Sequence, residues 1–200
     1  YPAETPFLHQ ALEALARQTL PPLEILLLPD NPSNHPWPPH VREIPTGRLR
    51  PAEKRNLGIQ EARGEIIAFL DDDAYPAPDW MERALAYFSI PRVVGIGGPA
   101  VTPPDDPLLA QLSGAVYERK IVSGGARFRY APGRVRESDD LPSCNLLVKK
   151  EALVAAGGFR ADYWPGEDTL LCLDLVHRQG GRLFYEPRAL VYHHRRPLFL

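Results

Sequence analysis

Three adjacent carboxylates, Asp71-Asp72-Asp73, directly follow an apolar run of strand length at residues 65–70. A buried strand there would deliver all three acids to its carboxyl end. Like charges this close repel one another unless a cation or hydrogen-bond donors compensate them. A hard divalent ion such as Mg²⁺ or Mn²⁺ binds carboxylates together with the oxygens of a diphosphate. The triplet therefore indicates a metal site, and the alternative is a solvated acidic turn that caps the following helix.

A second acidic pair, Glu167-Asp168, follows the aromatic segment Tyr163-Trp164-Pro165 and opens a helix predicted over residues 167–179. Carboxylates at a helix N-terminus are favoured by the free amides and by the helix dipole, so a capping role is one interpretation. The other is a general base that takes a proton from a substrate hydroxyl beside an aromatic wall.

Two histidines, His193 and His194, end a strand predicted over residues 189–192, and Arg195 and Arg196 follow them. Neighbouring side chains on a strand point to opposite faces, so at most one histidine faces a given site. That histidine would add a nitrogen ligand to a metal already held by carboxylates, unless its role is structural. The arginines would either contact a phosphate or serve as surface charge.

Residues 119–136 carry six basic side chains and no acidic one. This local charge of +6 indicates an anionic partner: a diphosphate, a phosphorylated lipid acceptor, an acidic membrane surface or RNA. The alternative is a solvated loop whose charge Asp139 and Asp140 balance. The basic residues are Arg119, Lys120, Arg127, Arg129, Arg134 and Arg136.

Alternating helices and strands must position these residues. Apolar spacing and Pro or Gly at the ends predict helices over residues 8–15, 51–63, 79–88 and 151–156. A further helix predicted over residues 167–179 is apolar on nearly every side, so we expect it to be buried. Short apolar runs predict strands over residues 23–28, 41–44, 65–70, 93–96, 144–148, 183–185 and 189–192. This order indicates an α/β sandwich with a largely parallel sheet, in which ligands bind beyond the carboxyl ends of the strands. Residues 99–140, rich in Pro, Gly and Arg, are predicted to be an inserted region with a weak helix over residues 108–117.

The composition is that of one globular domain. The 200 residues include 23 Lys and Arg against 25 Asp and Glu, a net charge of −2, which argues against a dedicated nucleic-acid-binding protein. The 2 cysteines stand outside disulfide or zinc spacing and favour a reducing, cytoplasmic setting. The apolar runs are far shorter than the about 20 residues that cross a bilayer. A start without Met and an apolar ending lead us to expect a piece of a longer chain.

Taken in order, these segments resemble the family 2 glycosyltransferases of the GT-A fold over nearly the whole chain. The resemblance implies an α/β, Rossmann-like sandwich with a mostly parallel central sheet. It makes residues 1–200 a single domain that lacks the family's first strand, with residues 99–140 inserted on the acceptor side. The matching motifs are Leu26-Leu27-Leu28-Pro29-Asp30, Lys54-Arg55-Asn56-Leu57-Gly58, Ile67-Ala68-Phe69-Leu70-Asp71-Asp72-Asp73, Cys144-Asn145-Leu146-Leu147-Val148, Gly166-Glu167-Asp168 and Val191-Tyr192-His193.

The resemblance also implies roles for individual residues. Asp168 matches the base that deprotonates the acceptor. Asp73 and His193 match the residues that bind Mn²⁺ or Mg²⁺. The residues expected to contact the nucleotide sugar are Asp30, Arg55, Asp71, Asp72 and Glu167.

The activity implied by the resemblance is a metal-dependent, inverting transfer of one sugar from a nucleoside-diphosphate sugar, with UDP as the expected nucleotide. The acceptor would be a carbohydrate or lipid-linked hydroxyl, and nucleic acid is not an expected partner. Such a domain would work in the cytoplasm, and peripheral association with the inner face of the membrane is a further expectation. One alternative is a GT-A domain that binds a nucleotide sugar without turnover. Another is a haloacid dehalogenase-type phosphatase, although its usual Thr or Val is Tyr75 here.

Overall fold

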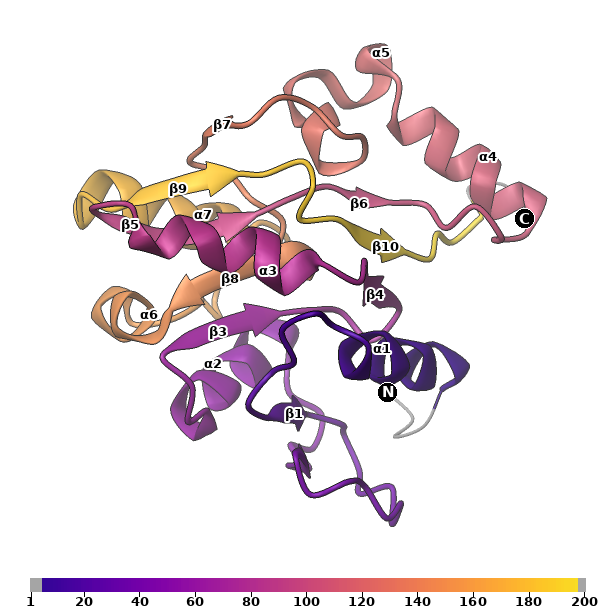
Figure 1. Cartoon of the computed structure of the whole chain (residues 1–200), viewed down its shortest axis with the longest axis vertical. Coiled ribbons are helices and arrows are strands. Elements are labelled where there is room, and N and C mark those ends of the chain that lie inside the picture. The colour runs from indigo at the N-terminus through magenta and orange to yellow at the C-terminus, as the bar shows by residue number, and fades with distance from the viewer. Residues whose placement is uncertain (1–4, 198–200) are drawn as a thin grey trace.

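The computed structural model describes residues 5–197, in which helices and strands alternate along the chain (Figure 1). The helices are α1 (Pro6–Ala16), α2 (Pro51–Glu61), α3 (Trp80–Leu85), α4 (Leu108–Tyr117), α5 (Lys120–Ser123), α6 (Lys150–Ala156) and α7 (Glu167–Leu173). The strands are β1 (Ile25–Leu27), β2 (Val41–Glu43), β3 (Ile66–Phe69), β4 (Ala74–Pro76), β5 (Val93–Gly97), β6 (Ala100–Val101), β7 (Arg136–Glu137), β8 (Leu146–Lys149), β9 (Arg182–Tyr185) and β10 (Val191–His193). None of the helices over residues 5–197 has the length and apolar character needed to cross a membrane.

The strands that the structure describes form three sheets. The largest has the order β3-β8-β5-β9-β7, a second has the order β4-β10-β6, and β1 pairs with β2. In the largest sheet β3, β5 and β9 run in one direction, whereas β8 runs against both of its neighbours and β7 runs against β9. The α/β class is confirmed, but the sheet is mixed, which corrects the expectation of a mostly parallel central sheet.

The direction of β8 follows from where the chain travels after β5. Residues 98–145 build their turns and short helices beyond the carboxyl end of β5, and no helix carries the chain back across the sheet before β8 begins. The chain therefore enters β8 from the edge at which β5 ended, and β8 has to run in the opposite direction. The sequence over residues 99–140 gives no signal for this reversal, because Pro and Gly mark turns without fixing their direction.

The strand predicted over residues 65–70 is present as β3, but it is less buried than expected. Ala68 is exposed, and Ile66 and Ile67 are only half-buried. Within residues 5–197, β3 pairs only with β8 and β1 pairs only with β2. Both strands line one large cavity, which explains the partial exposure of β3. That a further strand is missing from this domain stays a prediction.

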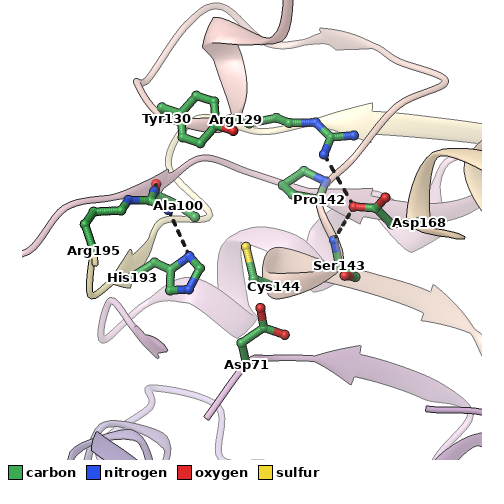
Figure 2. A pocket seen from close by; sticks show the side chains of 10 residues that line it. All are labelled: Asp71, Ala100, Arg129, Tyr130, Pro142, Ser143, Cys144, Asp168, His193 and Arg195. Carbon is green, nitrogen blue, oxygen red and sulfur yellow. Dashed lines mark hydrogen bonds and ion pairs between the residues drawn. The ribbon is translucent and has the colours of Figure 1, made fainter. Parts of the chain in front are cut away.

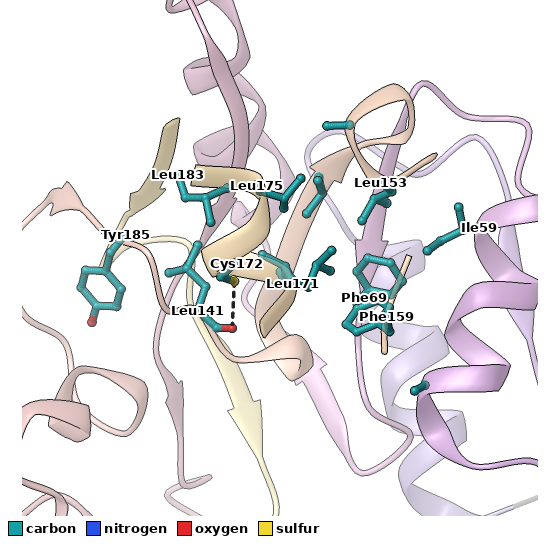
Figure 3. Packing of buried hydrophobic residues seen from close by; sticks show 14 residues of the cluster. Ile59, Phe69, Leu141, Leu153, Phe159, Leu171, Cys172, Leu175, Leu183 and Tyr185 are labelled. Atoms are coloured by element: carbon teal, nitrogen blue, oxygen red, sulfur yellow. Dashed lines mark hydrogen bonds between the residues drawn. The ribbon is translucent and has the colours of Figure 1, made fainter. Parts of the chain in front are cut away.

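The core lies on both faces of the five-stranded sheet. Leu146 and Val148 of β8 belong to the larger buried cluster, whereas Leu147 between them belongs to the second cluster, so neighbouring residues serve opposite faces. Figure 3 shows the larger cluster, in which α7 contributes Leu171 and Cys172, as expected for a helix predicted to be buried. On the other face α3 buries its Trp80 side chain. This layering is the predicted α/β sandwich.

A buried amide joins the segments that surround the start of β8. Asn145 is fully buried, and its Nδ2 donates hydrogen bonds to the carbonyl oxygens of Pro99 and Ala189 at 2.9 and 2.8 Å. Its Oδ1 accepts a hydrogen bond from Trp80 Nε1 at 2.8 Å. Asn145 is the hydrogen-bond partner of the buried Ala189 carbonyl oxygen and of Trp80 Nε1, whereas the Pro99 carbonyl oxygen also accepts from the backbone N–H of Val191 at 3.1 Å.

We therefore predict that Asn145→Ala lowers the free energy of unfolding by about 3 kcal/mol, because it leaves the buried Ala189 carbonyl oxygen and Trp80 Nε1 without their partner. Urea denaturation followed by circular dichroism measures this loss. The matched control is Asn31→Ala, whose exposed side chain should change stability by no more than about 0.5 kcal/mol. Equal losses in the two variants would contradict the structural role of Asn145.

Candidate active site

Strand pairing brings a histidine to the predicted acid triplet. β10 pairs antiparallel with β4, and His193 lies opposite Ala74, the residue after Asp73. This register puts His193 Nε2 2.9 Å from Asp73 Oδ1. Potential ligand atoms of Asp71, Asp73 and His193 all lie within 4.8 Å of one another. Two carboxylates and an imidazole form a donor set that suits Mn²⁺ and accommodates Mg²⁺, so these residues fit a divalent ion.

The neighbouring His194 faces a different part of the molecule. Its Nδ1 lies 2.5 Å from Asp106 Oδ1, and its Nε2 lies 2.7 Å from Gln10 Oε1. The backbone N–H of His194 donates to the carbonyl oxygen of Asp73 at 3.0 Å. Only one histidine of the pair therefore faces the acids, as the alternation along a strand predicts, and the other ties this strand to α1.

The pKa values of the acids differ because their partners differ. Burial would raise the pKa of Asp73, but the hydrogen bond and charge of His193 and the charge of Arg196 lower it below its ordinary value. Burial disfavours the charged form of His193, yet the contacts with Asp73 and Cys144 together outweigh burial and raise the pKa of His193. The side chain of Asp72 is turned toward solvent, and its pKa is raised by partial desolvation and by the charges of Asp73 and Asp71.

Arg55 on α2 bridges the two acidic segments. Its Nη2 lies 3.1 Å from Asp71 Oδ1, and its Nη1 lies 2.9 Å from Glu167 Oε1. The next residue, Asn56, exchanges two hydrogen bonds with the backbone of Phe159, at 2.8 and 2.7 Å. These contacts fix α2 against the turn before α7. Glu167 is thus a buried partner of Arg55, and its predicted contact with a nucleotide sugar stays a prediction.

Asp30 follows β1 and lies beside Lys54, the residue that precedes Arg55 on α2. Its Oδ1 is 2.5 Å from Lys54 Nζ, which also donates to the carbonyl oxygen of Leu28 at 2.9 Å. The hydrogen bond from Lys54 lowers the pKa of Asp30 to about 2. Lys54 and Arg55 therefore anchor two of the sequence-predicted acids, Asp30 and Asp71, to one helix.

Asp168 lines a separate, smaller cavity of about 190 Å³ (Figure 2). Its Oδ2 accepts hydrogen bonds from the backbone N–H of Ser143 at 3.3 Å and from Arg129 Nη1 at 3.4 Å. Its Oδ1 accepts from the backbone N–H of Thr169 at 2.8 Å. Each carboxylate oxygen has two acceptor positions, so Asp168 keeps the capacity to accept a hydroxyl proton from the cavity.

Two cavities meet at the acid cluster. Asp71 and His193 line both the smaller cavity and a larger one of about 590 Å³ that extends along β1, β3 and α2. Asp72 and Asp73 line only the larger cavity, and Asp168 lines only the smaller one. A molecule in each cavity would therefore meet the other beside Asp71 and His193.

Several residues of the smaller cavity were not assigned to a site with Asp168 from the sequence. Arg129 and Tyr130 lie within the predicted basic stretch, but nothing in the pattern distinguished Arg129, which points inward to Asp140 and Asp168, from its exposed neighbours. Arg195 donates from Nη1 to His193 Nδ1 at 3.1 Å and lies over the ring of Tyr130. The remaining residues in this group are Ala100, Pro142, Ser143 and Cys144.

Comparison with known sequences gives a consistent result. The family model described as Glycosyl transferase family 2 matches residues 3–154. A pre-mycofactocin glycosyltransferase of Mycobacterium tuberculosis is 33% identical over 149 residues, which cover 73% of this chain and 30% of that protein. A glucosyl-dolichyl phosphate glucuronosyltransferase of Haloferax volcanii is 24% identical over 147 residues, which cover 70% of this chain and 46% of that protein. The chain thus spans less than half the length of these relatives.

Solved structures show the same fold. A mannosyltransferase of Pyrobaculum calidifontis, in complex with GDP-Man and Mn²⁺, superposes with a TM-score of 0.68 at 19% identity and covers 97% of this chain and 55% of its own. GalNAc-T7 with UDP, GalNAc and Mn²⁺ also gives a TM-score of 0.68, at 17% identity, and covers 94% of this chain and 41% of its own. Both are GT-A glycosyltransferases, so the predicted fold is confirmed.

The bridge made by Arg55 generates a prediction about stability. Arg55→Ala should lower the free energy of unfolding by about 2 to 3 kcal/mol, because it leaves the buried Glu167 carboxylate without its partner. Adding Glu167→Gln should restore part of this loss, since no unpaired charge then remains buried. Urea titrations of the single and double variants measure both effects.

Arg17→Ala is the control, because the Arg17–Glu13 pair is exposed and should contribute less than about 0.5 kcal/mol. If the Arg55 and Arg17 variants lost the same stability, the bridge would not have the role assigned to it.

Proposed function

Because the chain belongs to glycosyltransferase family 2, we propose that it transfers one sugar from a nucleoside-diphosphate sugar to an acceptor hydroxyl, with inversion at the anomeric carbon. The observation that carries this proposal is the junction of the two cavities. Asp71 and His193 line both cavities at this junction, whereas Asp168 lines only the smaller cavity. A donor on one side and an acceptor on the other would meet between them.

The larger cavity suits the donor. Lys54, Arg55 and Arg196 line it and supply positive charge for a diphosphate, and Asp72 projects from the same wall as a ribose contact. Pro29 lines the same cavity, and Asp30, the next residue in the chain, would contact the base there. UDP is the nucleotide we propose, and related folds bind UDP or GDP-mannose in the solved complexes.

The cluster of Asp71, Asp73 and His193 would hold Mn²⁺ or Mg²⁺. When bound, such an ion offsets the negative charge that develops on the leaving diphosphate. The chain's own residues prepare this position. Arg55 orients Asp71 from one side, and Arg195 holds His193 from the other.

Asp168 would act as the general base. It takes the proton of the acceptor hydroxyl while the oxygen of that hydroxyl forms a bond to the anomeric carbon. The bond from the anomeric carbon to the diphosphate breaks on the opposite face, and its electron pair leaves with the nucleoside diphosphate. One displacement inverts the configuration, and no covalent intermediate forms. The amides of Ser143 and Thr169 hold the carboxylate in place, and Arg129 offsets its charge.

Because the chain belongs to the glycosyltransferase family, the phosphatase alternative is excluded. A GT-A domain that binds a nucleotide sugar without turnover remains the rival function, and activity measurements separate it from the transferase. The rival function would be favoured if the chain bound the nucleotide but released no nucleoside diphosphate with any of the sugar donors and acceptors tested.

We predict that Asp168→Asn lowers the rate of transfer by at least about 100-fold, because the amide cannot take the acceptor proton. The assay measures UDP released from a panel of UDP-sugars in the presence of alkyl glycoside acceptors and Mn²⁺. Binding of the nucleotide should persist. UDP with Mn²⁺ at about 100 times its dissociation constant should stabilise this variant, like the parent chain, by about 2.7 kcal/mol in a thermal-shift titration.

Asp73→Asn provides the contrast, because it should lose the Mn²⁺-dependent stabilisation together with transfer. Undiminished UDP release by the Asp168→Asn variant would refute its assignment as the base.

A further inference from the structure

The helix α4 carries its apolar side chains on the outside. Leu108, Leu109 and Leu112 are 70%, 48% and 52% exposed. The face that packs on the domain consists of small residues, since Ala110 and Gly114 are buried, and a Cβ at Gly114 would collide with Thr102. A helix on an ordinary protein surface has the opposite pattern, with its large apolar side chains facing the core.

The next helix extends the same surface. α5 begins three residues after α4 ends, and the two helices are in contact. Ile121 is 95% exposed and Val122 is 53% exposed. We call the five side chains of this surface the outer patch: Leu108, Leu109, Leu112, Ile121 and Val122. Exposed apolar side chains on neighbouring helices mark a binding surface more often than scattered ones do.

Basic side chains follow the outer patch along the chain. Residues 107–136 contain six basic residues and Glu118 as the one acid. One of the six, Arg129, turns inward to pair with Asp140 and Asp168. The other five are exposed: Arg119, Lys120, Arg127, Arg134 and Arg136.

We propose that the outer patch docks this domain on a lipid bilayer with anionic headgroups. The leucines, Ile121 and Val122 would enter the boundary between headgroups and acyl chains, and the flanking cations would meet the headgroup phosphates. A second copy of the chain fits less well. A symmetric contact through this surface would set two strongly basic segments against each other.

The inner side of the same segment reaches the smaller cavity. Tyr117 at the end of α4 stacks on Tyr130 with 5.1 Å between ring centroids, and Tyr130 and Arg129 line the cavity. Docking would therefore hold the cavity that contains Asp168 close to the bilayer. Under the proposed function, on which this last step rests, the acceptor is one that the bilayer carries.

The test is flotation of the purified chain with vesicles made of phosphatidylcholine alone or of equal parts phosphatidylcholine and phosphatidylglycerol. The chain should float with the anionic vesicles, and added NaCl should release it because salt screens the cations. Ile121→Gln and Lys120→Glu should each weaken this binding, and Ile121→Gln combined with Leu112→Gln should weaken it by roughly tenfold.

Matched controls lie elsewhere on the surface. Val154 on α6 is 62% exposed, so Val154→Gln tests the loss of an exposed apolar side chain outside the outer patch. Arg17→Glu tests the reversal of an exposed charge on α1. Both control variants should float like the parent chain. Thermal unfolding of every variant checks that the fold is intact.

Three results would overturn the proposal. They are failure to float with the anionic vesicles, flotation that the outer-patch variants leave unchanged, and a dimer in solution that Ile121→Gln dissociates. None of these measurements depends on sugar transfer, so a failure here leaves the proposed function standing. Failure of the transfer assay likewise leaves vesicle binding to be judged separately.

Discussion

Mutual repulsion among the three carboxylates after β3 is the constraint that organises this domain. The repulsion is relieved in a different way at each carboxylate. Asp71 pairs with Arg55 from α2, Asp73 pairs with His193 from β10, and Asp72 faces solvent. These partners come from other parts of the chain, so α2 and β10 have to pack at the end of β3 before the charges of the acids are compensated. A divalent ion would complete the neutralisation that the protein begins.

The acid cluster could be predicted from the sequence, because each of its parts has a local signal. An apolar run followed by Asp71-Asp72-Asp73 fixes where the acids emerge, and alternation along a strand predicts that only one of His193 and His194 faces them. Other features lack such a signal. The reversed direction of β8 depends on the path of residues 98–145, and the short strands β4, β6 and β7 exist only through pairing with distant strands. Whether Glu167 or Asp168 faces a cavity is decided by Arg55, more than 100 residues earlier in the chain.

The segment from β6 to β8 has an inner side that lines the smaller cavity and an outer side that is exposed. Its inner side supplies Arg129, which pairs with Asp168, and Tyr130, which lines the same cavity. Its outer side exposes apolar and basic residues that no described part of the domain covers. The excess of positive charge was visible in the sequence, but which basic residues face inward was not. The burial of Arg129 depends on Asp140 and Asp168, which the fold brings close to it.

The most direct test of the account is anomalous diffraction at the manganese edge from crystals grown with UDP and Mn²⁺. We expect a manganese peak beside Asp73 Oδ1 and His193 Nε2, with the diphosphate next to it and the nucleoside in the larger cavity along β1 and β3. A manganese peak away from these residues, or UDP seated in the smaller cavity with Asp168, would contradict it.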